Sequence, residues 1–223
     1  WNKLFGYGLF FIALLTFGIT VEPTASFWDC AEYIATSAKL QVGHPPGAPL
    51  FQMMGAFFSI FASSPDQIAL MVNFMSVISS ATTVLFLFWT ITLLLKKIYN
   101  IKSFDNSIKR ISFFGSASIG TLAFCFSDSF WFNAVEAEVY AMATCLMSIM
   151  FWLCLIWESE LNTPRGDRWL VLISFLVGLS FGVHFMALLT IPAMGMLYYF
   201  KNYKKVTLKG FIVANLISIA ILL

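Results

Sequence analysis

The run from Ile68 to Leu95 constrains the fold most, because it is almost wholly apolar and Asn73 is its one strongly polar interruption. A helix needs about 20 apolar residues to cross a bilayer, and this run is longer than that. The composition agrees, with 60% hydrophobic and 11% charged residues, against about 25% charged residues in soluble domains. A chain of this size cannot bury so much apolar surface, so it is predicted to be an integral membrane protein.

Further apolar runs predict an all-α, polytopic transmembrane helical bundle. The expected spans are about 4–21, 68–95, 111–130, 138–157, 169–183, 185–200 and 210–223. Residues 22–67 then form a large first external loop. The chain begins at Trp1 and ends inside an apolar run at Leu223. We therefore expect it to be the N-terminal part of a longer protein, with further helices beyond.

The basic residues predict how the bundle is oriented. Twelve of the 13 Lys and Arg residues fall before the first span or in alternating loops after it, and Lys39 is the exception. Loops rich in Lys and Arg face the cytoplasm. The N-terminus is therefore expected in the cytoplasm, and the loop at 22–67 on the external face.

The external loop concentrates ionisable groups in the segment EPTASFWDCAEYIATSAKLQVGHPPGAPLF. A short helix is expected over about 26–41, with Thr24 or Ser26 as its cap and the Gly-His-Pro-Pro-Gly turn at its end. Asp29 and Glu32 are three residues apart, so they share one face of that helix.

A second apolar stretch, about 51–62, follows in the same loop. It is short for a span, and counting it as one would place the later lysines outside. We interpret it as a helix at the outer membrane interface, with a re-entrant segment as the alternative.

Two other outer turns carry ionisable groups. Glu136 and Glu138 lie at the outer turn between the third and fourth spans, and His184 lies between the fifth and sixth. Ionisable groups at a bilayer edge usually face a cavity or one another, which indicates a polar, outward-opening cavity. Glu136 and Glu138 are two residues apart, and a helix cannot point both at one spot. At most one of them is expected to join Asp29 directly, and the other to make a structural hydrogen bond.

The segments FWDCAEYIATSAKLQVGHPPGAPLF and FWFNAVEAEVYAM carry a resemblance. Together with the basic residues after the long span, they resemble the GT-C membrane glycosyltransferases. Within that class they are similar to the transmembrane protein O-mannosyltransferases of animals and to bacterial relatives that carry a domain of unknown function. The resemblance covers most of residues 1–200. It implies inverting transfer of a sugar, with mannose favoured, from a polyprenyl-phosphate donor to a hydroxyl of an exported protein.

The resemblance also implies roles for single residues. Asp29 would be the general base, and Glu32 would bind sugar hydroxyls or share the proton. His44 would orient the loop or contact the phosphate, while Glu138 and His184 would line the cavity. GT-C enzymes often hold the lipid phosphate with Arg or Lys, and here Lys39 is the one external cation. Either Lys39 holds the phosphate, or a cation from the expected remainder of the protein does.

Each role has a structural alternative. Asp29 could cap a loop helix, Glu32 could be a solvated side chain, and His44 could only set a turn. Glu138 and His184 could make structural hydrogen bonds, and Lys39 could be solvated.

We expect no required cofactor. The four cysteines form no zinc-type pattern. A divalent metal at the acidic residues is possible in principle, because the spacing of Asp29 and Glu32 does not exclude it.

Two other function classes stay open. One is a transporter or lipid flippase with an acidic outer vestibule, although the lack of charges within the spans argues against ion coupling. The other is a non-catalytic membrane subunit of an envelope complex. The expected partners are a lipid-linked sugar, an exported acceptor protein and membrane lipid, without nucleic acid. The active face would be periplasmic in a bacterial inner membrane, which we favour, or lumenal in the endoplasmic reticulum.

Overall fold

Helices make up all the regular structure in the part of the chain that is described, which confirms the all-α prediction. The computed structural model describes residues 1–161 and 163–220. In chain order the elements are α1 (Asn2–Ile19), α2 (Cys30–Lys39), α3 (Pro49–Ser59), η1 (Pro65–Gln67), α4 (Ile68–Ile98), α5 (Ser107–Cys125), α6 (Asp128–Ala134), α7 (Val139–Glu160), α8 (Pro164–Ser180), η2 (Phe185–Leu189), α9 (Thr190–Asn202) and α10 (Leu208–Ala220).

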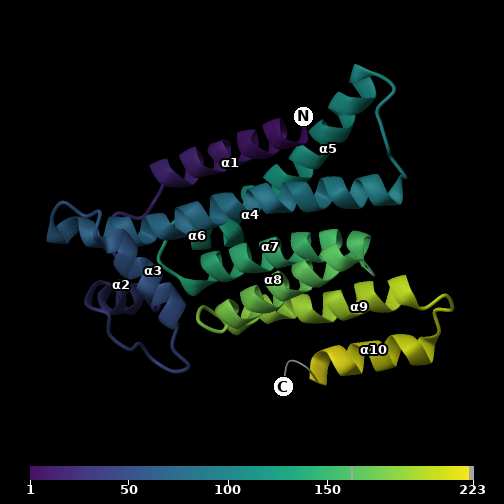
Figure 1. Ribbon diagram of the computed structural model, residues 1–223. Helices are drawn as coiled ribbons and strands as arrows, with labels where there is room; N and C mark the ends of the chain where they lie inside the picture. The colour runs from purple at the N-terminus through teal and green to yellow at the C-terminus, as the bar shows by residue number, and fades with distance from the viewer. Residues whose placement is uncertain (162, 221–223) are drawn as a thin grey trace.

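The long helix α4 is the centre of the molecule. It lies between α1 on one side and α7 on the other, and it also contacts α2, α3, α5 and α6 (Figure 1). Its buried face carries many small side chains, among them Ser76, Ser80 and Ala81. Small residues let neighbouring helices approach closely where apolar burial alone gives little driving force, as inside a bilayer.

The first core joins α1, α4, α5 and α6 through buried aromatic rings. Phe17, Phe88, Phe114 and Phe130 belong to it, and the Phe17 ring lies 5.9 Å from the Phe130 ring. The predicted span over 111–130 runs across a break in this region. α5 ends at Cys125, and α6 continues after a bend of 70°.

The second half of the chain forms α7, α8, α9 and α10. The Thr163 side chain accepts a hydrogen bond from the Gly166 N–H, and Pro164 occupies the first turn, so α8 begins earlier than the predicted span at 169. The stretch 185–200 is divided, because residues 185–189 form the 3₁₀ helix η2 and α9 begins at Thr190.

Three described helices are long and apolar enough to cross a membrane, namely α1, the continuous segment of η1 and α4, and α7. The bent pair α5–α6 passes the same test if it is taken as one span. The division into seven spans, with the boundaries expected above, stays a prediction.

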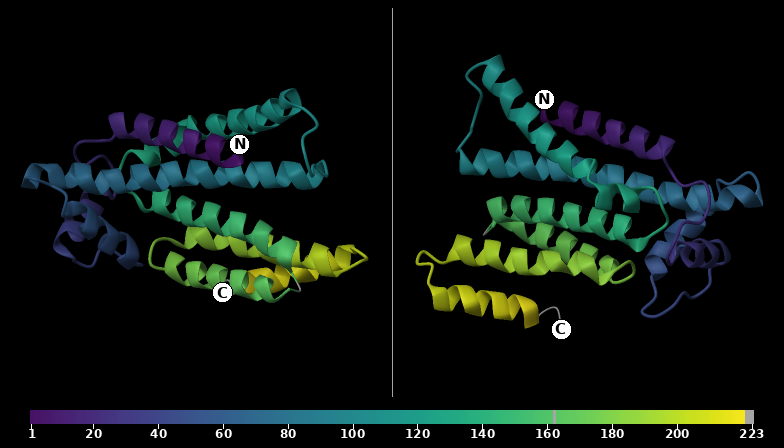
Figure 2. Two further views of the ribbon diagram at one scale, coloured as in Figure 1. Left: turned by 45° about the horizontal axis from the view of Figure 1, so that its top comes forward. Right: turned by 180° about the vertical axis from the view of Figure 1, so that it is seen from behind.

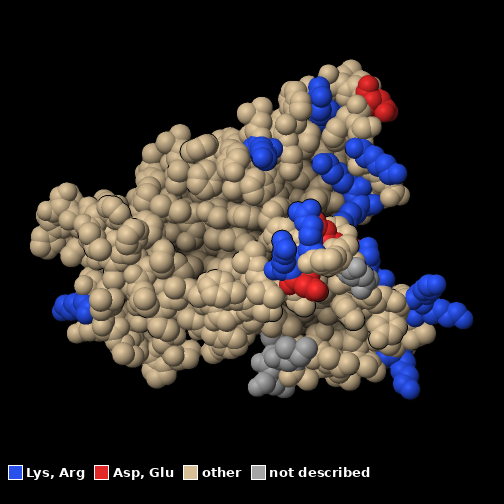
Figure 3. Space-filling model, in the orientation of Figure 1, with Lys and Arg blue, Asp and Glu red and all other residues tan. Residues whose placement is uncertain are grey.

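The two ends of the bundle differ in structure and charge. Figure 2 shows α2 and α3 beside the end of α4 at which that helix begins. Figure 3 shows Lys and Arg side chains gathered at the opposite end, near the α4–α5 and α9–α10 connections. The positive charge is therefore concentrated away from the helices of the first loop.

Candidate functional site

The first loop is packed against the beginnings of α4 and α7. Cys30 and Tyr33 of α2 and Phe51 of α3 are buried in one cluster with Met75 of α4 and Val139 of α7. A loop held by this much buried apolar surface keeps its polar side chains in fixed positions. Hence the residues at the start of α2 are positioned by the helical bundle.

Asp29 precedes α2 but does not cap it with its side chain. It occupies the N-cap position without a side-chain capping hydrogen bond, and its side chain is 56% exposed. The predicted caps are wrong: α2 begins at Cys30, and Ser26 donates its hydroxyl hydrogen to Glu136. The Asp29 carboxylate is thus left open at the surface.

Glu32 and His44 lie beside Asp29 and form an acid–histidine trio with it. The Glu32 carboxylate accepts a hydrogen bond from the His44 backbone N–H at 2.6 Å. Its other oxygen lies 3.1 Å from His44 Nδ1, and His44 Nε2 lies 3.8 Å from Asp29 Oδ2. The hydrogen bond from the His44 backbone N–H, followed by that from its ring, lowers the pKa of Glu32.

The turn that carries His44 is folded back onto α2. The helix ends with Leu40 in a left-handed conformation at φ 49°. The Gln52 side chain then donates a hydrogen bond to Thr36 Oγ1 at 3.0 Å. A Cβ atom at Gly43 would lie 2.9 Å from Gln52 Nε2 and 3.2 Å from Glu32 Oε1. The glycine therefore permits the close approach that brings His44 to Glu32.

Glu136 and Glu138 are both buried in the turn before α7, at 2% and 5% exposure. They precede the helix, so the helical spacing argument does not apply to them. Glu136 accepts the hydrogen bond from Ser26. Oε1 of Glu138 is buried with no hydrogen-bond partner among the described residues.

Burial raises the pKa of Glu138 to about 7, and the nearby carboxylates of Glu136 and Asp29 add to the rise. The Asp29 carboxylate is thus close enough to Glu138 to affect its pKa. A carboxyl group of this kind is half protonated near neutral pH. It can then donate as well as accept a hydrogen bond.

His184 and Lys39 stand apart from the trio. His184 Nδ1 accepts a hydrogen bond from the Met186 backbone N–H at 3.1 Å, at the start of η2. Its ring lies 5.2 Å from that of Tyr140, and burial lowers its pKa. Lys39 is exposed in the last turn of α2. In the described part of the chain, no hydrogen bond or ion pair joins either residue to the trio.

Sequence reasoning missed Asn73 and Tyr33 as parts of the site. Asn73 is fully buried, and its amide donates hydrogen bonds to the backbone carbonyls of Glu22 at 2.6 Å and Thr24 at 2.8 Å. It thereby fastens the chain that leads to Asp29. Tyr33 lies 5.9 Å from the His44 ring. The signal for Asn73 was its isolation in the apolar run, whereas Tyr33 gave none.

The trio also has the composition of a small cation site. One ligand atom from each of Asp29, Glu32 and His44 lies within 4.8 Å of the others. Carboxylate oxygen and imidazole nitrogen can ligate divalent metals. Both Glu32 oxygens also lie within hydrogen-bond distance of His44. The contacts within the trio therefore have a sufficient explanation without a metal.

Comparison with known proteins identifies a family and a curated relative. The family described as Protein O-mannosyl-transferase TMEM260 N-terminal domain matches residues 29–207, a range that contains all six predicted site residues. Protein O-mannosyl-transferase tmem260 of Dictyostelium discoideum is 24% identical over 162 residues, which are 72% of this chain. The match covers 18% of that relative's length. No solved structure matches significantly.

Proposed function

The chain belongs to the family of the protein O-mannosyl-transferase TMEM260 N-terminal domain, and from this membership we propose that it carries the sugar-transfer site of a membrane glycosyltransferase. In the proposed reaction a sugar, with mannose favoured, moves from a polyprenyl-phosphate donor to a hydroxyl group of an exported protein. The donor's phosphate is the leaving group.

The observation that carries the proposal is the open carboxylate of Asp29 beside the fixed pair of Glu32 and His44. Asp29 makes no side-chain capping bond and is more than half exposed. An exposed carboxylate that makes no capping bond and lies 3.8 Å from a single histidine nitrogen is suited to act as a general base.

The proposed transfer proceeds in one displacement. Asp29 removes the proton from the acceptor hydroxyl as its oxygen attacks the anomeric carbon. The bond between that carbon and the phosphate oxygen breaks, and the lipid phosphate leaves with the electron pair. Attack opposite the leaving group inverts the configuration. Proton transfer by a positioned carboxylate contributes roughly 10²–10⁴-fold to such a rate.

Glu32 and His44 position this base. Glu32 binds both the backbone N–H and the ring of His44, which fixes the turn and directs Nε2 towards Asp29. The contact of Nδ1 with Glu32 holds the ring so that Nε2 faces Asp29. We therefore assign His44 to orienting Asp29, while the exposed edge of Glu32 is available to a sugar hydroxyl.

Glu138 is proposed to bind the substrate in its protonated form. Its unpartnered buried oxygen and its raised pKa suit a hydrogen bond with a sugar hydroxyl next to Asp29. His184 would contact the substrate from the η2 side. Lys39 would approach the phosphate from the end of α2, because it is the one cation in the first loop.

The proposed active face is the external one, which is the periplasm in a bacterium and the lumen of the endoplasmic reticulum in a eukaryote. The concentration of cations at the opposite end of the bundle supports this orientation. We propose that the reaction needs no metal cofactor.

The test uses the full-length protein in lipid nanodiscs. Radiolabelled polyprenyl-phosphate-mannose and an extract of exported proteins are supplied, and transfer of label to protein is measured. Asp29→Asn should lower the transfer rate roughly 10²–10⁴-fold. The matched control is Asp66→Asn, an exposed acid of the same loop in η1, which should keep the wild-type rate.

Two results would overturn the proposal. One is a folded wild-type protein that transfers no sugar from any polyprenyl-phosphate donor, which would favour a transporter or a non-catalytic subunit. The other is an Asp29→Asn variant as active as Asp66→Asn, which would remove Asp29 from the reaction.

A further inference from the structure

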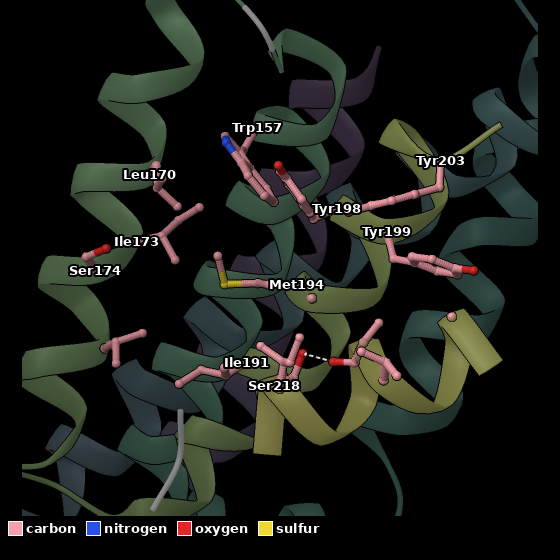
Figure 4. Close-up of a pocket in the computed structure, with 16 residues that line it drawn as sticks. Trp157, Leu170, Ile173, Ser174, Ile191, Met194, Tyr198, Tyr199, Tyr203 and Ser218 are labelled. Carbon is pink, nitrogen blue, oxygen red and sulfur yellow. Dashed lines mark hydrogen bonds between the residues drawn. The ribbon is translucent and has the colours of Figure 1, made fainter. Parts of the chain in front are cut away.

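A large apolar cavity lies in the second half of the bundle, away from α2 and α3. α8 forms one wall, α9 and α10 form the other, and Trp157 of α7 contributes to its lining. Its volume is about 690 Å³, within the roughly 300–1,000 Å³ of typical ligand pockets. Figure 4 shows Leu170 and Ile173 on α8 across the space from Met194 and Ile191.

The walls of the cavity are fixed by packing. Gly195 of α9 lies so close to Ser218 of α10 that any side chain there would collide with it. Nearer the connection between these helices, the Tyr199 hydroxyl accepts a hydrogen bond from the Thr207 N–H at 3.2 Å. On the other side, Ile173 of α8 is buried against α7. The space between the walls is therefore part of the helix arrangement.

The side chains that line the cavity are aromatic at one end and aliphatic towards the other. Trp157, Tyr198 and Tyr203 lie together at one end, and Ile191 lies towards the other (Figure 4). The Ser218 hydroxyl is already bonded to the Ala214 carbonyl of its own helix. Aromatic side chains with a polar edge favour the level of lipid headgroups, whereas aliphatic ones favour hydrocarbon. This gradient matches a lipid with its headgroup at the aromatic end.

The aromatic end borders a cluster of cations. Lys204, Lys205 and Lys209 surround the connection between Tyr203 and Gly210, two residues that line the cavity. In the described part of the chain, none of these three lysines forms an ion pair. Lys201, by contrast, pairs with Glu158. The rim of the cavity thus carries positive charge that no described acid neutralises.

We propose that this cavity binds one anionic phospholipid of the surrounding membrane, with an acyl chain between α8 and α9–α10 and its phosphate among Lys204, Lys205 and Lys209. An apolar interior next to lysines matches a molecule that is itself hydrocarbon at one end and anionic at the other. A water-soluble ligand would find too few free polar partners inside. The inference does not depend on the proposed transferase, because it uses no residue of that site.

The test is native mass spectrometry of the full-length protein with phosphatidylglycerol or phosphatidylcholine added to the detergent. One phosphatidylglycerol should bind tightly, and phosphatidylcholine should bind at least tenfold more weakly. Replacing Lys204, Lys205 and Lys209 together by Gln should weaken phosphatidylglycerol binding roughly 100-fold. The charge-matched control replaces Lys3, Lys96 and Lys102 by Gln, and it should retain binding.

A second pair of variants separates the cavity from its charged rim. Ser174→Trp fills the cavity from α8 and should abolish the tightly bound lipid, whereas Leu172→Trp on the same helix lies outside the lining and should not. Equal melting temperatures would show that both variants fold.

Three outcomes would overturn the proposal. Equal binding of both lipids would remove the role of the lysines. Unchanged binding by Ser174→Trp would place the lipid on the outer surface. A full-length protein without bound phosphatidylglycerol, destabilised by Ser174→Trp, would mean that another part of the protein fills the cavity.

Discussion

Replacement of Asn73 by Leu should disturb the candidate active site without touching any of its acids. Leu has the same number and branching of side-chain heavy atoms as Asn, but it cannot donate the two hydrogen bonds that hold the carbonyls of Glu22 and Thr24. Each such bond contributes about 0.5–1.5 kcal/mol, so the free energy of unfolding should fall by about 1–3 kcal/mol. Loosening the chain that leads to Asp29 should also reduce transfer roughly 100-fold, as expected for a base displaced by about 1 Å.

The assay combines the transfer measurement with thermal unfolding followed by tryptophan fluorescence. Ser79→Ala is the matched control in α4, because the Ser79 hydroxyl bonds only to the Met75 carbonyl of its own helix. It should change neither activity nor stability by much. Wild-type activity in a folded Asn73→Leu protein would refute the reasoning. The packing of α2 and α3 alone would then be sufficient to position Asp29.

Further predictions concern Glu138, the C-terminal end of α7 and metal dependence. Because Glu138 has a raised pKa of about 7, its contribution to stability should be complete below about pH 4.5 and lost as the pH rises through 7. Glu138→Gln should flatten that dependence in unfolding measured from pH 4 to 8. Glu158 pairs with Lys97 of α4 and Lys201 of α9, so Glu158→Gln should lower stability by about 1–2 kcal/mol, and an unchanged melting temperature would contradict this. Chelation with EDTA should leave the rate of sugar transfer unchanged. Loss of activity that one divalent metal restores would instead indicate that the trio binds that metal.

Much of the helical architecture follows from the sequence, because apolar runs as long as that around α4 have few other ways to satisfy their backbone groups. The two helices of the first loop were also predicted, although α2 is shorter than expected. The bend between α5 and α6 was not predicted. Hydropathy stays high through Phe124 and Phe126, and it carries no information on the direction of the chain.

The site was only partly predictable for a related reason. Asp29 and Glu32 come close through helical spacing, which the sequence shows directly. Their contact with His44 depends on a turn folded back across α2, and the bond between Ser26 and Glu136 joins segments 110 residues apart. Contacts of that kind depend on how the helices pack, which composition and periodicity do not specify.

The helix α4 makes one side-chain interaction near each of its ends that fixes a neighbouring segment. Near its start Asn73 holds the chain before Asp29, and near its other end Lys97 pairs with Glu158. Each of these two side chains reaches its partner only from its present side of the helix. Successive residues of an α-helix are rotated by about 100° about the helix axis. A single residue inserted between them would rotate one anchor away from its partner, whereas an exposed substitution would not. We therefore expect this helix to accept changes of side chain far more readily than changes of length.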